Sequence, residues 1–556
     1  MFRYRQTDAI AMPLSRREFL LDSAASTLFA SSARVRGQHS AFPFQHGVAS
    51  GDPLTDRVIL WTRLSLPKGT TSAACQWLVA TDPQLQNVVQ QGQVFTGAHR
   101  DFTVKVDVDG LQPGRSYYYV FETAGLRSDI GRTKTLPTGS VQHLRLAYTS
   151  CSNITRGHFN VYKELARRAD LDAILHLGDY IYEYADLDHC ERTGRLHQPL
   201  YETHTLTDYR QRHACYKQDK DLQEVHRQHP FLVIWDDHEV ANNAWKGGAD
   251  NHESDSEGNW HERLSGAVRA YLEWMPLREP ELPERGIYRS FRFGDLVDLT
   301  MLDTRLAGRD AQAEDMDERN RQDRTLLGQT QEQWLAETLA ASVQQQVRWN
   351  LTGQQVMVAQ LGTNNMPFNY DQWDGYPAAR KRLFDSVRNA GVENWVVLTG
   401  DIHSSWALEL YDDPFADNTG KPVGVELVTP AVTSPGIESQ VRADVAAASL
   451  ETLLPHLNFV DFFYRGYVLL DITHERLQAE WWVVDNIDSH RYASNCLRAL
   501  SMKAGTHELK PAPRLASQRR ATPLAPAFAD ELAVLRRWRH NWSNTLDGML
   551  ASSNSL

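Results

Sequence analysis

Four short segments of this chain place potential metal ligands directly after an apolar stretch. Each apolar stretch has the composition of a buried β-strand, and in an α/β sheet the carboxyl ends of neighbouring strands open onto one crevice. Side chains that are far apart in the sequence can therefore converge there. The pattern predicts the active site of a metallohydrolase, built from LRLAYTSCSN near Cys151, AILHLGDYIYEY around Asp179, FLVIWDDHEVANN around Asp236 and WVVLTGDIHSSW around Asp401.

The second of these segments supplies a carboxylate and a phenol. Its apolar residues end at Gly178, which lets the backbone turn, so that Asp179 can enter the crevice and bridge two cations. Tyr182 follows three residues later, a spacing that can return its phenol to the same metal. An aspartate after a glycine is more often part of a turn or a helix cap. The recurrence of the same order in four segments favours the metal site.

The third segment is rich in oxygen ligands, which suit hard divalent cations. Neighbouring side chains of an extended chain face opposite ways, so we expect one of Asp236 and Asp237 to be a ligand and the other to support it. Asn242 and Asn243 follow shortly afterwards as amide ligands. The alternative interpretation of this cluster is the acidic N-terminus of a helix.

The fourth segment combines a carboxylate with an imidazole. Asp401 and His403 are two residues apart, which would place both side chains on one face of an extended segment. A lone histidine is more often an ordinary core or surface residue. The neighbouring aspartate and the three companion segments favour metal binding here.

The elements around these segments predict an α/β protein, with an N-terminal β-sandwich over residues 41–137 and a layered α/β domain over residues 143–505. Residues 103–108 alternate so that three valines share one face, and SYYYVFE, after a Pro-Gly turn, is expected to be the neighbouring strand. Apolar periodicity predicts helices around residues 159–169 and 264–272 that cover the sheets. Polar insertions at 186–229 and 245–260 are expected to line or cover the site, although such composition is by default a solvated loop.

Residues 1–33 have the features of an export signal. The sequence SRREFL at residues 15–20 is a twin-arginine pattern, and a modestly apolar stretch with small residues at Ser31 and Ala33 follows it. We therefore expect the twin-arginine export machinery to deliver the chain to the periplasm or the exterior; a basic amphipathic start is the lesser alternative. No other segment has the roughly 18 to 20 apolar residues that span a bilayer, so no transmembrane anchor is expected.

The composition is typical of a large enzyme. A chain of 556 residues with 42% hydrophobic content can bury more than one core, and its net charge of −12 opposes tight binding of nucleic acid. Five cysteines leave at least one unpaired; we expect this to be Cys151, and Cys190 and Cys215 are a candidate disulfide. The proline-rich tail at 506–556 is expected to dock onto its parent domain rather than onto a membrane or a partner.

The four segments, preceded by HGVASGDPLTDRVILWTRL, resemble the PhoD-type alkaline phosphatases and phosphodiesterases of the calcineurin-like metallophosphatase superfamily. The match is dense, is in the right order and extends from about His46 to the strand near Trp482. The resemblance implies two central sheets flanked by helices behind an N-terminal β-sandwich. It also implies twin-arginine export and hydrolysis of a small-molecule phosphoester that releases inorganic phosphate or a phosphomonoester.

The resemblance also implies a set of ligands. Cys151 and Tyr182 would hold a ferric ion, and Asp179 would bridge it to a second site filled by Ca²⁺ or another hard divalent cation. The second site would include Asp236 and Asn243, although the choices of Asp237 and Asn242 stay open. Asp401 and His403 would close the cluster, with their assignment to one metal or the other left undecided.

Bound cations would make hydroxide available as the nucleophile and neutralise the phosphoryl oxygens. We expect help from Arg156 or Arg305 in contacting phosphate, although an ion pair is an equal alternative for each. His238 is expected to protonate a leaving group or to orient a metal ligand. Two further functions remain open: a lipid phosphodiesterase of the phospholipase type and a non-catalytic exported binding protein stabilised by metal. The oligomeric state is not predicted.

Overall fold

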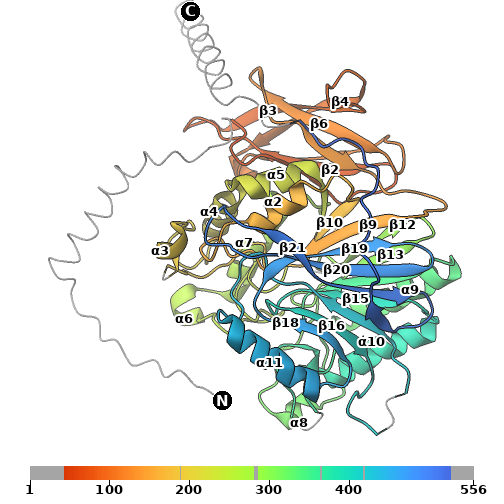
Figure 1. Cartoon of the computed structure of the whole chain (residues 1–556). Coiled ribbons are helices and arrows are strands. Elements are labelled where there is room, and N and C mark those ends of the chain that lie inside the picture. The colour runs from red at the N-terminus through yellow and green to blue at the C-terminus, as the bar shows by residue number, and fades with distance from the viewer. Residues whose placement is uncertain (1–42, 188, 281–285, 364–365, 418–419, 527–556) are drawn as a thin grey trace, which may run out of the picture. The chain divides into compact units, whose positions relative to one another are not determined.

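A computed structural model describes residues 43–187, 189–280, 286–363, 366–417 and 420–526 (Figure 1). The predicted signal at residues 1–33 and residues 527–556 of the predicted tail lie outside the described residues. The described residues belong to one compact unit. Within the described residues, no helix is both long and apolar enough to cross a membrane.

The largest sheet contains ten strands, and its centre is parallel. Strands β9, β10, β11 and β1 pair in parallel, whereas the outer pairs are antiparallel. In spatial order the strands are β22 (Leu509–Pro511), β21 (Ser494–Lys503), β20 (Arg476–Val484), β19 (Arg465–Ile472), β9 (Leu144–Thr149), β10 (Ala173–His176), β11 (Pro230–Val233), β1 (Val48–Gly51), β2 (Val58–Arg63) and β5 (Thr103–Val108).

The second sheet contains seven strands and is also parallel at its centre, from β13 through β14 and β15 to β17. Its order is β12 (Arg289–Phe293), β13 (Val297–Met301), β14 (Trp349–Gln354), β15 (Trp395–Thr399), β17 (Gly424–Val428), β16 (Ser405–Leu410) and β18 (Leu457–Asp461). A parallel bridge between Ser150 and Ala431 joins the two sheets just beyond β9 and β17.

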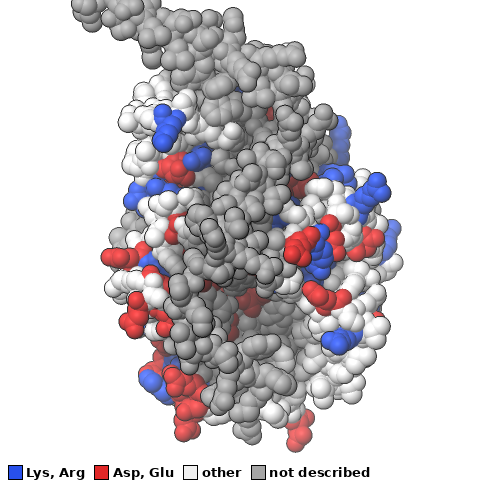
Figure 2. Space-filling model, turned by 90° about the vertical axis from the view of Figure 1, so that its left-hand side faces the viewer, with Lys and Arg blue, Asp and Glu red and all other residues white. Residues whose placement is uncertain are grey.

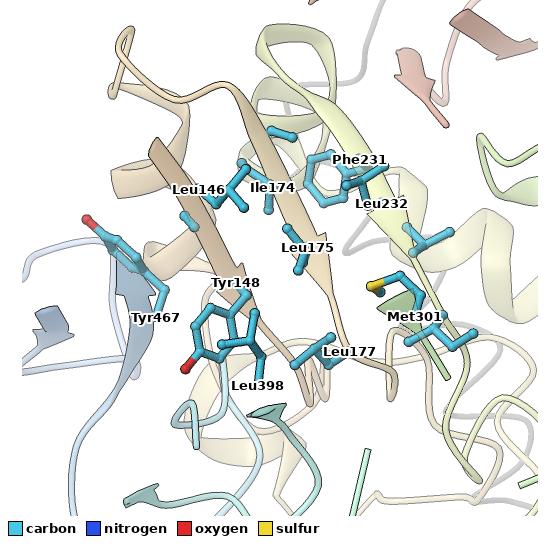
Figure 3. Close-up of a cluster of buried hydrophobic side chains, with 14 of the residues drawn as sticks. Leu146, Tyr148, Ile174, Leu175, Leu177, Phe231, Leu232, Met301, Leu398 and Tyr467 are labelled. Atoms are coloured by element: carbon cyan, nitrogen blue, oxygen red, sulfur yellow. The ribbon is translucent and has the colours of Figure 1, made fainter. Parts of the chain in front are cut away.

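The core between the two large sheets is filled from both sides. Figure 3 shows Leu146, Leu175 and Leu232 of the ten-stranded sheet beside Met301 and Leu398 of the seven-stranded sheet. Strand β15 is apolar on both faces because its alternate residues enter different cores. Val396 and Leu398 pack between the sheets, while Trp395 and Val397 pack against the outer helices.

Helices cover the outer faces, as the layered α/β prediction requires. Helices α2 and α5 pack on the ten-stranded sheet, and α9 and α10 on the seven-stranded sheet. The helices are α2 (Asn160–Ala166), α3 (Cys190–Thr193), α4 (Leu206–Lys217), α5 (Lys220–Gln228), α6 (Ser254–Glu257), α7 (Trp260–Trp274), α8 (Met316–Arg319), α9 (Gly328–Gln344), α10 (Pro377–Ala390) and α11 (Gln440–Leu453). The predicted helices around residues 159–169 and 264–272 are α2 and α7.

The N-terminal β-region is a sandwich that shares strands with the large sheet. A third sheet packs on β2 and β5. Its strands, in spatial order, are β4 (Val88–Gly97), β3 (Ser72–Ala80), β6 (Ser116–Thr123) and β7 (Leu126–Arg127), and β8 (Gly131–Lys134) also pairs with β6. Val104 and Val108 lie in the core between these sheets, with Val106 packed against it, as the alternation predicted. However, β5 and β6 are not neighbours: β5 pairs with β2, and β6 pairs with β3 in the opposite sheet. The Pro-Gly segment crosses between the sheets, because alternation alone cannot distinguish a hairpin from a crossing connection.

The proposed disulfide is wrong. All five cysteines are free thiols, and Cys190 and Cys215 direct their sulfur atoms to the carbonyl oxygens of Leu187 and Leu196.

Candidate metal centre

The candidate site lies beyond the carboxyl ends of the parallel strands of both sheets. Cys151 follows β9, Asp179 follows β10, and Asp236 follows β11 of the ten-stranded sheet. Arg305 follows β13 and Asp401 follows β15 of the seven-stranded sheet. This arrangement places the crevice where the two sheets meet.

Five of the seven predicted ligands have a left-handed backbone, which is uncommon for residues other than glycine. The φ angles are 61° at Cys151, 52° at Asp179, 54° at Asn243, 61° at Asp401 and 55° at His403. Such a conformation costs roughly 1 to 2 kcal/mol per residue, and it concentrates at functional sites where the surrounding fold holds it. The strain supports a function for these turns.

Two glycines allow the ligand turns to approach one another. A Cβ atom on Gly178 would lie 2.4 Å from the Cβ of Asp236, and one on Gly400 would lie 2.9 Å from the Cβ of Ser150. Gly178 also has a φ of 104°. A larger residue would push the turns apart, so the Gly-Asp pairs of the sequence have a steric reason.

One group of ligand atoms combines sulfur, oxygen and nitrogen. The ligand atoms of Cys151, Asp179 and His403 lie within 4.8 Å of one another. The Tyr182 hydroxyl donates to Asp179 Oδ2 at 2.9 Å, lies 3.2 Å from His403 Nε2 and accepts from Ser434 at 2.6 Å. The family resemblance implied Cys151 and Tyr182 as ferric ligands and Asp179 as the bridge, and the structure brings these three together with His403.

A second group consists of carboxylates alone. Oxygens of Asp236, Asp237 and Asp401 lie within 4.8 Å of one another, and Asp179, Asp237 and His238 form a third group that joins the first two. Asp401 and His403 therefore belong to different groups instead of sharing one face. The extended geometry assumed for them is wrong, because β15 ends at Thr399 and both residues have positive φ.

The premise that Asp236 and Asp237 face opposite ways also needs correction, whereas the choice of metal ligand between them stays a prediction. Both carboxylates enter the site, because β11 ends at Val233 and the chain turns there instead of continuing as a strand. The Asp237 amide donates to Asp236 Oδ1 at 2.9 Å, which tightens this turn. Asn243 is held at its edge, where its amide N–H donates to Asp237 and its side chain donates to Asp250, both at 2.6 Å.

The buried carboxylates fit cations. Asp179 Oδ1, Asp236 Oδ2 and Asp237 Oδ1 are buried without a hydrogen-bond partner among the described residues. Burial, with repulsion from the neighbouring carboxylates, raises the pKa of Asp179 and Asp236 well above the usual range. Burial and nearby Asp179 likewise raise the pKa of the Cys151 thiol. Unsatisfied acceptors of this kind are stabilised by a bound cation, which favours their ionised forms.

Arg305 neutralises part of this charge. It is fully buried and donates to Asp236, to both oxygens of Asp371 at 2.9 and 3.0 Å, and to Asp401 at 2.9 Å. Its guanidinium also lies 3.5 Å from Asp237. Of the two roles considered for Arg305, the geometry gives an ion pair with carboxylates.

The two predicted catalytic residues lie in different surroundings. His238 belongs to the group that joins the carboxylates, and its Nδ1 lies 2.7 Å from Glu183 Oε2. Arg156 forms an ion pair with Asp186 at 2.5 Å and is not hydrogen-bonded to any of the predicted ligands. Its contact with phosphate stays a prediction.

Sequence reasoning missed the carboxylate that holds two ligand turns together. Glu239 accepts hydrogen bonds from the backbone amides of Asp179 at 3.1 Å, Tyr180 at 2.5 Å and Asp236 at 2.7 Å. It also missed Glu183 and Asp371, which hold His238 and Arg305. The only signal for Glu239 was its position in the WDDHE cluster. This signal was weak, because a glutamate beside an Asp-Asp-His run has the same appearance in the sequence as a surface acid.

Comparison with known proteins covers both regions of the chain. Residues 146–481 match the family model of PhoD-like phosphatase, and residues 30–137 match that of its N-terminal domain. Alkaline phosphatase D of Bacillus subtilis (strain 168) is 38% identical over an alignment of 468 residues, and the match covers 80% of this chain and 78% of that protein. A solved structure described as PhoD superimposes with a TM-score of 0.77 at 34% identity and covers 93% of this chain and all of the solved chain.

Proposed function

The chain belongs to the PhoD-like phosphatase family and is a hydrolase of phosphoric ester bonds, and we propose that it acts through Fe³⁺ and a harder divalent cation such as Ca²⁺. The convergence of Cys151, Asp179 and His403 beside an all-carboxylate group is the observation that carries the proposal. Thiolate, phenolate and imidazole suit a transition metal, whereas carboxylate oxygens suit Ca²⁺.

In this proposal Cys151, Asp179, Tyr182 and His403 hold the ferric ion. Asp179 also faces the second position, which Asp236, Asp237 and Asp401 surround, with Asn243 at its edge. Bound cations supply the nucleophile by lowering the pKa of water toward about 7 and stabilise charge on the phosphoryl oxygens.

The residues around the ligands have supporting roles. Glu183 orients the His238 ring through Nδ1, so that Nε2 is the atom available for proton transfer to the leaving group. Arg305 limits the repulsion among four carboxylates, and Ser434 orients the Tyr182 phenol toward the site. On the described part of the face in Figure 2, basic and acidic side chains are interspersed, and no broad one-signed patch is visible there.

Metal-dependent hydrolysis can be tested directly. The protein is stripped of metal and then reloaded with Fe³⁺ alone, Ca²⁺ alone or both, and hydrolysis is followed with p-nitrophenyl phosphate, bis(p-nitrophenyl) phosphate and a phospholipid. We expect the two ions together to restore activity toward the first two substrates. Full activity of the stripped protein contradicts the metal proposal, and activity confined to the phospholipid favours the lipid phosphodiesterase.

We also propose that the chain is exported by the twin-arginine machinery to the periplasm or the exterior. The support is the SRREFL sequence at residues 15–20, which lies outside the described residues. Replacing Arg16 and Arg17 with lysine should leave the protein in the cytoplasm on cell fractionation. Unchanged export of this variant would contradict the proposal.

A further inference from the structure

A small recess lined by three arginines adjoins the candidate metal centre. Arg156, Arg192 of α3 and Arg465 of β19 line a cavity of about 160 Å³, which we call the arginine recess. The three come from segments far apart in the sequence: the turn after β9, the polar insertion and the start of β19. None of the roles assigned to the metal ligands uses Arg192 or Arg465.

The arginine recess shares a wall with the candidate metal centre. Thr433 and Pro435 line the recess. The Thr433 amide donates to the Cys151 carbonyl oxygen at 3.3 Å, and His403 Nδ1 lies 3.0 Å from the Pro435 carbonyl oxygen. Residues 433–435 therefore line the arginine recess and also contact Cys151 and His403 of the candidate metal centre.

Arg465 is a buried cation without a hydrogen-bonded carboxylate among the described residues. Arg465 is only 8% exposed, and its Nη1 donates to the carbonyl oxygens of Phe463 at 2.8 Å and Tyr464 at 3.2 Å. Its Nε is buried without a partner in the part of the chain that the structure describes. Burial lowers the pKa of Arg465 to about 10 although Asp461 and Glu438 oppose the shift. A buried guanidinium in this state gains stability from an anion.

The other two arginines also keep donors for a ligand. Arg156 pairs with Asp186 at 2.5 Å and Arg192 pairs with Asp488 at 3.0 Å, and both ion pairs use Nε. In the described residues, neither arginine has a hydrogen bond from its Nη groups to another side chain. Guanidinium groups with free Nη donors recognise phosphate through paired charge-assisted hydrogen bonds.

Three acids also line the arginine recess, and two of them are already engaged. Asp488 pairs with Arg192, and Asp485 accepts from the Ala493 amide at 2.7 Å. The third acid, Glu438, repels an anionic ligand. A ligand must therefore contact several arginines at once, so that their attraction outweighs this repulsion. A phosphate group, with up to four oxygens, meets this requirement better than a single carboxylate does.

We propose that the arginine recess binds a second phosphate group of the substrate while the scissile phosphoester lies at the metal centre. This inference rests on the proposed metal-dependent hydrolysis and adds a substrate class to it. The preferred substrates are phosphoesters that carry another phosphate a short distance away, as in a bisphosphate.

The test uses the metal-loaded, full-length enzyme and matched pairs of substrates. Ethane-, propane- and butanediol bisphosphates are compared with the corresponding hydroxyalkyl monophosphates, and phosphate release gives kcat/KM for each. We expect at least one bisphosphate to exceed its monophosphate about tenfold, since one charge-assisted contact is worth about that factor. In Arg465→Gln and Arg192→Gln this ratio should fall toward one, mainly through KM.

The outcomes are separable. Arg192 is partly exposed, so Arg192→Gln remains informative even if Arg465→Gln fails to fold. The exposed Arg321, which pairs with Asp323, provides the control Arg321→Gln, which should keep the wild-type ratio. Two results overturn the proposal that the arginine recess binds a second phosphate. One is an equal kcat/KM for the bisphosphate and the monophosphate of every pair in the wild type, and the other is a preference for the bisphosphate that both recess variants retain. Failure to hydrolyse any of the compounds overturns the proposed function instead.

Discussion

Cys151 and Asp179 are the residues on which the chemistry depends most. Cys151 supplies the sulfur atom of the first group of potential ligands, and Asp179 takes part in two of the three groups. Changes to residues that only support metal ligands lower activity about 10- to 100-fold. We therefore expect Cys151→Ala and Asp179→Asn each to lower kcat for p-nitrophenyl phosphate by at least about 100-fold.

Metal analysis and circular dichroism accompany this measurement. Cys151→Ala should lose iron and its visible absorption, while both variants keep the wild-type far-ultraviolet spectrum. Full turnover of either variant with unchanged metal content would contradict the roles given to these two residues.

At the same scale, the sequence predicted which residues meet but not how each one turns. The ligand types after four apolar strands identified Cys151, Asp179, Asp236 and Asp401, because strand ends in an α/β sheet converge. It did not predict that Asp237 also enters the site, since that depends on where β11 ends. Nor did it separate His403 from Asp401, because left-handed backbone at non-glycine residues has no sequence signal.

Between elements, Glu239 is the residue that connects the turn after β10 with the turn after β11. Its carboxylate accepts from three backbone amides, two in the first turn and one in the second. In Glu239→Gln one acceptor oxygen becomes a donor, which leaves a buried amide unpaired. We expect a loss of about 1 to 3 kcal/mol of unfolding free energy, together with weaker metal retention and a lower kcat.

Glu480 provides the matched control. It is buried in β20 and also accepts three hydrogen bonds, from Gln478, Trp482 and the Ala516 amide, away from the ligand turns. Glu480→Gln should be destabilised similarly but keep its metals and its kcat. If the two variants lose metal and activity equally, Glu239 has only a structural role.

The elements themselves were partly predictable. Apolar periodicity placed α2 and α7 correctly. Strand β5 was predicted with the correct buried face and the wrong neighbour. Pairing partners depend on contacts between distant segments, which local patterns do not contain.

Across the whole molecule, buried histidines predict sensitivity to acid. Burial, helped by nearby cations, lowers the pKa values of His176, His213 and His229 to about 3. The unfolded chain binds these protons near pH 6.5, whereas the folded chain does not. The free energy of unfolding therefore falls as the pH drops from about 6.5 toward 3, by about 1.4 kcal/mol per pH unit for each histidine.

Urea unfolding at pH 7.5, 6 and 5 measures this dependence. His213→Asn, which cannot titrate, should lose less stability between pH 6 and 5 than the wild type. Equal stability of the wild type at pH 7.5 and 5 would show that these histidines are not held neutral in the folded protein.

The predicted N-terminal β-sandwich is present in the structure, but it is not separate from the α/β domain. The composition of residues 41–137 indicated a β-sandwich, and the structure has one, but three of its strands continue the ten-stranded sheet through the parallel pair β1 and β11. The family model of the N-terminal domain ends at residue 137, but the hydrogen bonding of the ten-stranded sheet continues from one region into the other. The boundaries at 41–137 and 143–505 stay predictions.

Convergence of dispersed ligands around two cations is the central claim, and anomalous X-ray diffraction at the iron absorption edge tests it most directly. Crystals of the active, metal-loaded protein should give an iron peak between Cys151, Asp179, Tyr182 and His403, with a lighter ion beside Asp236 and Asp401. An active enzyme whose crystals show no metal between these side chains would contradict the account.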